Sequence, residues 1–549
     1  MKKTLLTTSI FALFAGAVIA EDLNITSSDL TAGARNYIAI DQSTDYTISI
    51  NGTTANNTPI NVQRLYIANE IKTGSYEYGN LNVSVENLTT SRLALLCVND
   101  EGSSAVSLKD ITYNVASSVS TGEFYSVGQY WYGGVFSANS TNITFNGNAS
   151  AYITAGAMVS NNSSFTMKNG TSFTMNDANA TASWMYVGGY AQNNATLNVY
   201  GGTKTIISAG SVGNKITDVL VGEVFGGAYS LSGANVAING GSDIKITGGD
   251  FSNAYVFGGN AVETSKGFSN GFIDSTSVDV SGVTAKRVYG GSRRIGSEES
   301  NVVLGKEGST STVSQVKISN ATVLEGVYGA GSQDTVNGNI EITIGNGANV
   351  NNVYGGGFNS TVNGNTNITI MENASVSGII SGGDESEGVV SGNKNLFVKE
   401  FNGSALNISN FDKIEISADS KVEFANAFDV ETLVVEAPTI TLFSTDAQVT
   451  LVEGTTFDTL TLVGDFEQNQ INLNTVFGDS AGVVLSALED KNTALTVIDS
   501  NGQEWATENL SSENGILSFE KGAAIPEPST YAMIFGAIAL GFVAYRRRK

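Results

Sequence analysis

Residues 335–357 read TVNGNIEITIGNGANVNNVYGGG, and residues 361–383 read TVNGNTNITIMENASVSGIISGG. The second copy begins 26 residues after the first, and both share the opening Thr-Val-Asn-Gly-Asn, an Ile-Thr-Ile segment and a closing Gly-Gly. Val350 and Val376 also occupy the same place in the two copies. A repeat of fixed period indicates a supersecondary unit that is stacked along the chain.

The repeat has the pattern of strands. Ile340, Ile342 and Ile344 alternate with polar residues, as a half-buried strand requires. Asn-Gly pairs at 337–338, 346–347 and 363–364 are typical of turns that need left-handed backbone. We therefore predict an all-β chain, a right-handed parallel β-solenoid in which each coil stacks Ile and Val on the next. An antiparallel sandwich is the alternative, but it requires neither a near-fixed period nor a recurring corner.

Looser copies of the closing element precede the two long repeats. They are WYGGV from Trp131, VGGY from Val187, VFGGA from Val224, VFGGN from Val256, VYGGS from Val288 and VYGAG from Val327. In the favoured interpretation, valine and ring stack into ladders while the glycines allow neighbouring backbones to approach closely. In the other, the rings form an outward stripe that can stack on sugars. Those rings are Tyr132, Phe225, Phe257, Tyr289, Tyr328 and Tyr354.

Composition excludes several classes of function. The chain has no histidine, which rules out Ser-His-Asp and Cys-His nucleophile systems and His-ligated metals. Cys97 is the single cysteine, so we expect no intrachain disulfide and interpret it as a buried small hydrophobe. Outside the two terminal segments 22 of the 28 basic residues remain, against 52 acidic residues in the whole chain. Such a surface repels phosphate backbones, so we expect no nucleic-acid partner.

The glycine-rich, histidine-free, acidic repeats resemble the exported β-helical passengers of autotransporters and surface adhesins, over about residues 120–390. An autotransporter ends in a membrane barrel of many alternating strands, whereas this chain ends in a single apolar segment. At the other end, Lys2 and Lys3 precede the apolar run 5–19, which is typical of a secretory signal peptide. We predict cleavage between Ala20 and Glu21.

The last 25 residues have three parts in order. Pro526-Glu527-Pro528 precedes 17 uncharged residues, 529–545, and the chain closes with a basic cluster of Arg546, Arg547, Arg548 and Lys549. Together they resemble the PEP-CTERM sorting signal, with a single transmembrane helix and a stop-transfer cluster on the cytoplasmic side. The resemblance implies an exosortase-type sorting enzyme as partner. It also implies anchoring, at least transient, in the bacterial inner membrane, then the cell surface or extracellular polysaccharide matrix.

We expect five segments along the chain. These are a signal peptide (1–20), an N-terminal cap with early coils (21–119), the glycine-rich solenoid (120–394), less regular coils with a C-terminal cap (395–523) and the sorting tail (525–549). Residues 395–490 keep a strand pattern with fewer glycines, as in KIEISADSKVEF from Lys413. No linker rich in proline or charge divides the body.

Two charged clusters are candidates for chemistry. Asp384, Glu385 and Glu387 could gather Ca²⁺, but the calcium-binding nonapeptide is absent, and we favour a solvated acidic loop. A basic island consists of Lys286, Arg287, Arg293 and Arg294. It could meet an acidic polysaccharide, but we favour an exposed loop that balances nearby acids such as Glu298 and Glu299.

The remaining acids are scattered, so no motif for carboxylate catalysis stands out. We therefore predict no enzyme activity, no cofactor and no metal. The expected function is that of an exported envelope or matrix protein with structural and adhesive contacts. The alternative is a polysaccharide-binding or polysaccharide-cleaving β-helix enzyme.

Overall fold

The computed structural model of the chain describes residues 21–67, 74–95, 105–128, 133–213, 221–264, 267–296, 300–436, 448–464, 470–489, 493–499, 502, 504–513 and 515–524. Glu21 is the first residue of strand β1. The other expected cleavage and tail residues lie outside these ranges, as do Cys97, Tyr132, Glu298 and Glu299. Within the ranges, no helix has the length and hydropathy that a membrane crossing requires.

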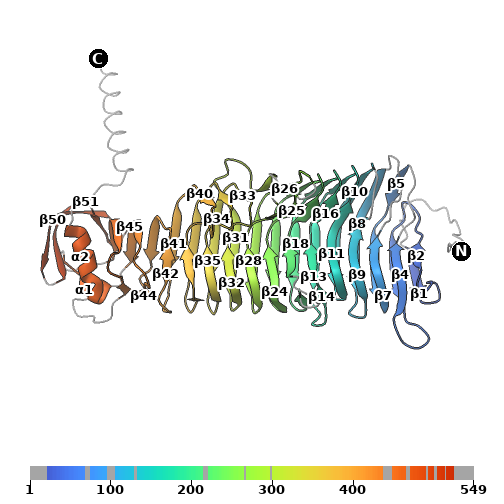
Figure 1. Cartoon of the computed structure of the whole chain (residues 1–549), viewed down its shortest axis with the longest axis horizontal. Coiled ribbons are helices and arrows are strands. Elements are labelled where there is room, and N and C mark those ends of the chain that lie inside the picture. The colour runs from blue at the N-terminus through green and yellow to red at the C-terminus, as the bar shows by residue number, and fades with distance from the viewer. Residues whose placement is uncertain are drawn as a thin grey trace, which may run out of the picture. The chain divides into compact units, whose positions relative to one another are not determined.

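The chain forms two compact units, unit 1 up to Lys394 and unit 2 from Asn395. Unit 1 is all-β and consists of two long parallel sheets (Figure 1). The first sheet contains β1 (Glu21–Thr26), β3 (Tyr46–Asn51), β5 (Ser75–Tyr78), β6 (Leu81–Glu86), β8 (Ala105–Val115), β10 (Val135–Phe145), β12 (Ser164–Met167), β13 (Thr171–Met175), β17 (Thr196–Tyr200), β18 (Thr203–Ile207), β22 (Asn235–Asn239), β23 (Ser242–Ile246), β26 (Asn270–Ile273), β27 (Thr276–Ser281), β30 (Val302–Leu304), β31 (Thr312–Ser319), β33 (Thr335–Val336), β34 (Asn339–Ile344), β36 (Thr361–Val362), β37 (Thr366–Ile370) and β40 (Val389–Val390).

The second sheet carries the side chains discussed below. Its strands are β2 (Arg35–Ile38), β4 (Ile60–Ile67), β7 (Leu88–Leu95), β9 (Ser120–Val127), β11 (Asn148–Val159), β14 (Thr181–Ala182), β15 (Trp184–Tyr186), β16 (Gly189–Gln192), β19 (Ser211–Val212), β20 (Gly222–Phe225), β21 (Ala228–Leu231), β24 (Asp250–Phe257), β25 (Ala261–Glu263), β28 (Thr284–Tyr289), β29 (Arg293–Ile295), β32 (Thr322–Tyr328), β35 (Asn349–Tyr354), β38 (Ser375–Val376) and β39 (Ile379–Ser381).

Each coil of unit 1 stacks on the next in parallel register, which is a β-helix arrangement. Ile342 of β34 pairs with Val316 of β31 on one side and with Ile368 of β37 on the other. All three side chains are at most 2% exposed. The alternation predicted for Ile340, Ile342 and Ile344 is therefore confirmed, and columns of aliphatic side chains form the interior between the two sheets.

The Gly-Gly elements are corners where the two sheets approach each other. A Cβ on Gly258 would lie 2.8 Å from Thr276 Cβ and 3.0 Å from Val278 Cγ2, both on first-sheet strand β27. It would also lie 2.3 Å from the carbonyl oxygen of Gly290 in the next coil. Glycine is thus required by the lack of space, as predicted for these corners.

The Asn-Gly pairs differ among themselves. Gly347 has φ +69° and uses the left-handed backbone that such pairs favour. Gly364 does not have a positive φ, and its requirement is steric, because a Cβ there would lie 2.2 Å from the carbonyl oxygen of Gly338. A positive φ is therefore found at Gly347 and, at +139°, at Gly338, whereas the expectation is wrong at Gly364.

Unit 2 begins with parallel strands and ends with antiparallel ones. Its strands are β42 (Asn407–Ser409), β43 (Lys413–Ile416), β44 (Val422–Glu423), β45 (Asp429–Glu436), β46 (Val449–Thr450), β47 (Thr456–Val463), β48 (Gln470–Asn472), β49 (Ala494–Ile498), β50 (Glu504–Glu513) and β51 (Ile516–Ala524), and β41 (Lys394–Val398) lies at the boundary. Strands β43, β45, β47 and β49 pair in parallel, whereas β50 pairs antiparallel with β49 and with β51.

Helices in unit 2 correct the expectation of strands throughout residues 395–490. Helix α1 (Leu473–Phe477) leads through a short 3-10 turn (Gly478–Ser480) into α2 (Ala481–Glu489). The Asn472 side chain accepts a hydrogen bond from the backbone N–H of Asn474 and so caps α1. Asparagine is a preferred cap residue, so this start signal was present in the sequence.

Candidate functional site

One column of side chains runs across the second sheet of unit 1, coil after coil. Pairing places its members directly above one another on β2, β4, β7, β9, β11, β15, β20, β24, β28, β32 and β35. We call it the ring column, and in chain order it contains Tyr37, Tyr66, Ala94, Tyr125, Thr154, Tyr186, Phe225, Phe257, Tyr289, Tyr328 and Tyr354.

The rings of this column stack on one another. Phe225 and Phe257 have ring centroids 4.8 Å apart, and Tyr289 and Tyr328 have centroids 4.3 Å apart, with interplanar angles of 7° and 11°. All four rings are at most 3% exposed. The ladder of the favoured interpretation is confirmed, whereas the alternative, a stripe accessible to sugars, does not apply to these four buried rings.

The ring column nevertheless lies on the face opposite the aliphatic interior. The valine that precedes each ring from Phe225 to Tyr354 is fully buried, and successive side chains of a strand point to opposite faces, so valine and ring lie on opposite faces of the sheet. Phe257 and its neighbours form a hydrophobic cluster together with Tyr229 and Ala261 of the strands beyond the corner. The rings are therefore buried by side chains that cover them from outside.

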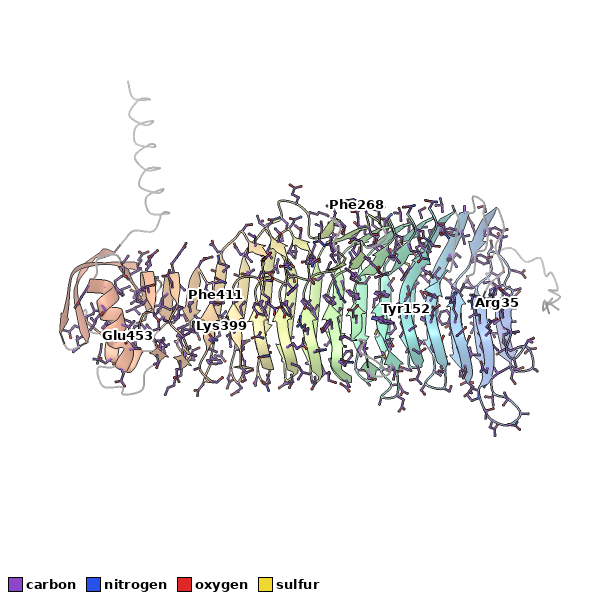
Figure 2. All side chains as sticks on the ribbon, viewed as in Figure 1. Arg35, Tyr152, Phe268, Lys399, Phe411 and Glu453 are labelled. Carbon is purple, nitrogen blue, oxygen red and sulfur yellow. The ribbon has the colours of Figure 1, made fainter. Side chains whose placement is uncertain are left out.

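Two further columns cover the rings. The first flank lies two residues before the ring column and contains Arg35, Arg64, Arg92, Glu123, Tyr152, Trp184, Glu223, Tyr255 and Arg287. The second flank lies beyond the corner and contains Met158, Tyr190, Tyr229, Ala261 and Arg293. We call the three columns together the strip; Arg35 and Tyr152 are labelled in Figure 2.

The flanks meet over the ring column through ionic and aromatic contacts. Arg293 of the second flank forms an ion pair with Glu223 of the first. The Tyr152 ring stacks on Trp184 with centroids 5.5 Å apart and contacts Tyr190 edge-on at 6.5 Å. Tyr152, Trp184, Tyr190 and Tyr255 are half-buried, so each keeps part of its ring accessible.

The basic island lies on two strands and not in an exposed loop, and its members Arg287 and Arg293 belong to the flanks of the strip. Lys286 and Arg287 lie on β28, and Arg293 and Arg294 lie on β29. Arg287 forms an ion pair with Glu325, and its guanidinium carbon lies 5.5 Å from the centre of the Tyr255 ring. The favoured loop interpretation is therefore wrong, because strand pairing brings these residues to a partly buried surface with aromatic neighbours.

The tyrosine hydroxyl groups under the flanks stay protonated at neutral pH. Burial raises the pKa of Tyr289 to about 12, and its hydroxyl accepts a hydrogen bond of 3.1 Å from Arg287 Nη1. Burial also raises the pKa of Tyr328, whose hydroxyl donates to Glu385 Oε2 at 2.8 Å. These groups can therefore orient charged side chains but do not supply a base.

The acidic candidates 384, 385 and 387 separate in space and role. The Asp384 carboxylate accepts backbone N–H groups from several neighbouring residues, including Gly357 at 2.9 Å and Ser360 at 3.1 Å. Glu385 binds Tyr328, and Glu387 is exposed, so a solvated loop describes only the last of them. Among the described residues no group of three or more acids or cysteines is placed to hold a metal ion.

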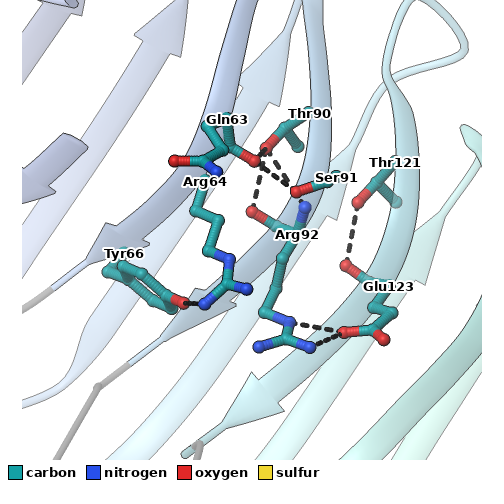
Figure 3. A network of polar contacts seen from close by, with 8 residues as sticks. All are labelled: Gln63, Arg64, Tyr66, Thr90, Ser91, Arg92, Thr121 and Glu123. Carbon is teal, nitrogen blue, oxygen red and sulfur yellow. Dashed lines mark hydrogen bonds and ion pairs between the residues drawn. The ribbon is translucent and has the colours of Figure 1, made fainter. Parts of the chain in front are cut away.

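At the N-terminal end of the strip, the first flank consists of arginines. Figure 3 shows Arg64 and Arg92 side by side on neighbouring strands. Arg92 forms an ion pair with Glu123, and its guanidinium carbon lies 5.6 Å from the centre of the Tyr125 ring. Arg64 Nη1 donates to the Tyr66 hydroxyl at 3.4 Å.

Comparison with known protein families, with curated proteins and with solved structures finds no match. The strip must therefore be interpreted from its own chemistry. Its rings offer apolar faces, and its arginines, glutamates and tyrosine hydroxyls offer hydrogen bonds in fixed positions. This combination suits a ligand with alternating apolar and polar faces, such as a sugar ring.

The sequence patterns located five ring-column members, from Phe225 to Tyr354, and missed most of the strip. Tyr37, Tyr66, Tyr125 and Tyr186 lie outside the Val-ring-Gly-Gly pattern. In the element from Val187, the ring that joins the column precedes the valine. The spacing of the arginines could have revealed the N-terminal part of the strip. Arg35, Arg64 and Arg92 are each about one coil apart, and Tyr37 and Tyr66 follow the first two by two residues.

Proposed function

We propose that this chain is an exported bacterial envelope or matrix protein whose solenoid is a scaffold with an adhesive, glycan-facing strip. The supporting observation is the strip itself: a stacked ring column in register across successive coils, flanked by half-exposed rings and fixed charges. A long surface built from repeated contacts suits a long, repetitive ligand. The proposal includes a right-handed winding of the coils.

The proposal also includes the two terminal segments. Residues 1–20 would direct export, with cleavage between Ala20 and Glu21. Pro526, Glu527 and Pro528 would present the tail to an exosortase-type enzyme, after a single helix over residues 529–545 has held the protein in the inner membrane. Arg546, Arg547, Arg548 and Lys549 would keep the end of that helix on the cytoplasmic side.

The arrangement of carboxylates favours a scaffold over the alternative, a polysaccharide-cleaving enzyme. Glycoside hydrolysis requires two carboxyl groups on either side of one bond. On or beside the strip, Glu123, Glu223 and Glu325 each form an ion pair with an arginine. Each of these carboxylates is therefore already held by a cation.

The test uses the full chain expressed in a bacterium that possesses an exosortase-type enzyme. Wild-type protein is expected at the cell surface or in the matrix, and a Pro526→Ala/Pro528→Ala variant is expected in the inner-membrane fraction. Extracted matrix polysaccharide incubated with the protein should gain no new reducing or unsaturated ends. Identical location of both proteins would contradict the sorting part, and new chain ends would establish the enzyme.

A further inference from the structure

The arginines of this protein are concentrated on one surface. Between residues 21 and 524 the sequence contains six, at 35, 64, 92, 287, 293 and 294. Five of them belong to the two flanks of the strip, and Arg294 is the neighbour of the fifth. Four lysines, at 109, 204, 245 and 317, lie on first-sheet strands, whereas Lys286 lies on second-sheet strand β28 next to Arg287. In a chain of formal charge −24, this concentration of arginine on one surface indicates a specific role for that surface.

The stacking of Arg35, Arg64 and Arg92 is unfavourable without a ligand. Register places the three directly above one another, and neighbouring strands lie about 4.8 Å apart. Like charges directly opposite each other destabilise a sheet. Arg92 is compensated by Glu123, but neither Arg35 nor Arg64 forms an ion pair with a described residue.

Arg35 and Arg64, which have no acidic partner among the described residues, are accessible and have aromatic neighbours. Arg35 is exposed and Arg64 is half-buried. Tyr37 is 39% exposed and stacks on Tyr66 with ring centroids 5.3 Å apart. Farther along the same flank, Tyr152 and Trp184 follow Glu123 in register. One line of side chains thus offers cations first and accessible rings next.

We propose that Arg35 and Arg64 form a binding site for the carboxylates of an acidic, uronate-containing polysaccharide that lies along the first flank. Arginine presents a planar fork that matches a carboxylate with two parallel hydrogen bonds, which lysine does not. An extended polysaccharide carries its carboxylates at regular intervals, and coils present their arginines at regular intervals. The accessible rings of Tyr152 and Trp184 stack on sugar faces farther along.

The site deepens the proposed function by naming its ligand class. Phosphate polymers fit less well, because the acidic surface repels dense charge and, among the described residues, Arg35 and Arg64 are the first-flank cations without an acidic partner. A second copy of this acidic chain is the competing occupant. Its carboxylates would pair with the arginines, but it would not stack along the row of accessible rings.

The experiment measures binding of the full-length chain, solubilised in detergent micelles, to fluorescent oligouronates at low and physiological salt. The Arg35→Gln/Arg64→Gln variant is expected to bind at least about tenfold more weakly, because two charge-assisted contacts are lost. The matched control, Lys204→Gln/Lys245→Gln, removes the same charge from exposed first-sheet positions and should bind within a factor of about two of the wild type, since long-range charge is screened.

Stability provides a second readout. Removing Arg64 from between two arginines relieves repulsion, so the double-arginine variant should unfold at the same temperature as the wild type or a higher one. Equal weakening by both variants would overturn the site, as would neutral or sulfated oligosaccharides that bind as tightly as oligouronates. Arginine-dependent self-association without oligouronate binding would assign the surface to a second copy. Loss of oligouronate binding with correct export and sorting would leave the proposed function intact.

Discussion

At the residue scale, Asp334 is an acidic side chain that the fold buries, although aspartate usually lies at the surface. It lies at a corner, is 3% exposed, and accepts backbone N–H groups of Ser292 at 2.8 Å and Gly331 at 3.0 Å. Burial raises its pKa from 3.8 to about 6, even though these hydrogen bonds lower it. Nothing in the sequence around it distinguishes this aspartate from the many exposed ones.

The raised pKa predicts a dependence of stability on pH. Between pH 3.8 and about 6 the folded protein keeps a proton that the unfolded chain has released, so the contribution of Asp334 to stability falls as pH rises through this window. A difference of about two pKa units corresponds to about 3 kcal/mol. In Asp334→Asn this part of the pH dependence should vanish, although the protein is less stable throughout, because the amide cannot accept both N–H groups.

Urea unfolding of both proteins from pH 4 to pH 8, followed by circular dichroism, measures this difference. Asp243→Asn serves as the control, because Asp243 is exposed on β23 and its replacement should leave the pH dependence unchanged. An Asp334→Asn profile parallel to that of the wild type would contradict the assignment.

At the element scale, the sequence could predict the strands and the corners but only part of the strip. Ile340, Ile342 and Ile344 reveal their burial by alternation, and Gly258 reveals its corner by recurrence. Arg35 and Arg64 carry no local signal, because their adjacency depends on register between coils whose loops differ in length. Helix α2 (Ala481–Glu489) was not predicted because residues 395–490 were assigned a strand pattern as a whole.

The corners give the second prediction. Gly258→Ala should lower the free energy of unfolding by about 3 kcal/mol or more, because the new Cβ meets backbone oxygen and two opposing side chains. Gly482→Ala is the matched substitution in α2, where no atom lies within 4 Å of the new Cβ, and it should raise stability by about 0.5–1 kcal/mol. Thermal unfolding of the two variants distinguishes steric demand from a general intolerance of alanine. Equal effects of the same sign would refute the steric explanation.

At the scale of the whole molecule, stacking of coils makes the length of unit 1 adjustable. Each coil contacts mainly its neighbours, so stability is close to a sum over coils. Deleting residues 335–360 removes β33, β34 and β35 together and joins Asp334 to Thr361, which already pairs in register with Thr335. The remaining strands can then pair without a shift.

We expect the 335–360 deletion to fold, with the strand signal in circular dichroism reduced in proportion and an unfolding temperature lower by a few degrees. Deleting only residues 335–347 removes β33 and β34 and should abolish soluble protein, because second-sheet strand β35 would then follow second-sheet strand β32 without the first-sheet strands that complete the coil. Comparable yields of the two deletion proteins would argue against coils as the unit of folding.

The contact between Tyr152 and Trp184 has an optical consequence. The chain has three tryptophans, and Trp184 lies at the accessible edge of the strip, with its ring 5.5 Å from that of Tyr152. Light absorbed by the stacked tyrosines would pass to this indole, whose emission responds to the polarity around it. With Trp131 and Trp505 replaced by phenylalanine, the emission of Trp184 would report the binding of a ligand to the strip without an attached dye.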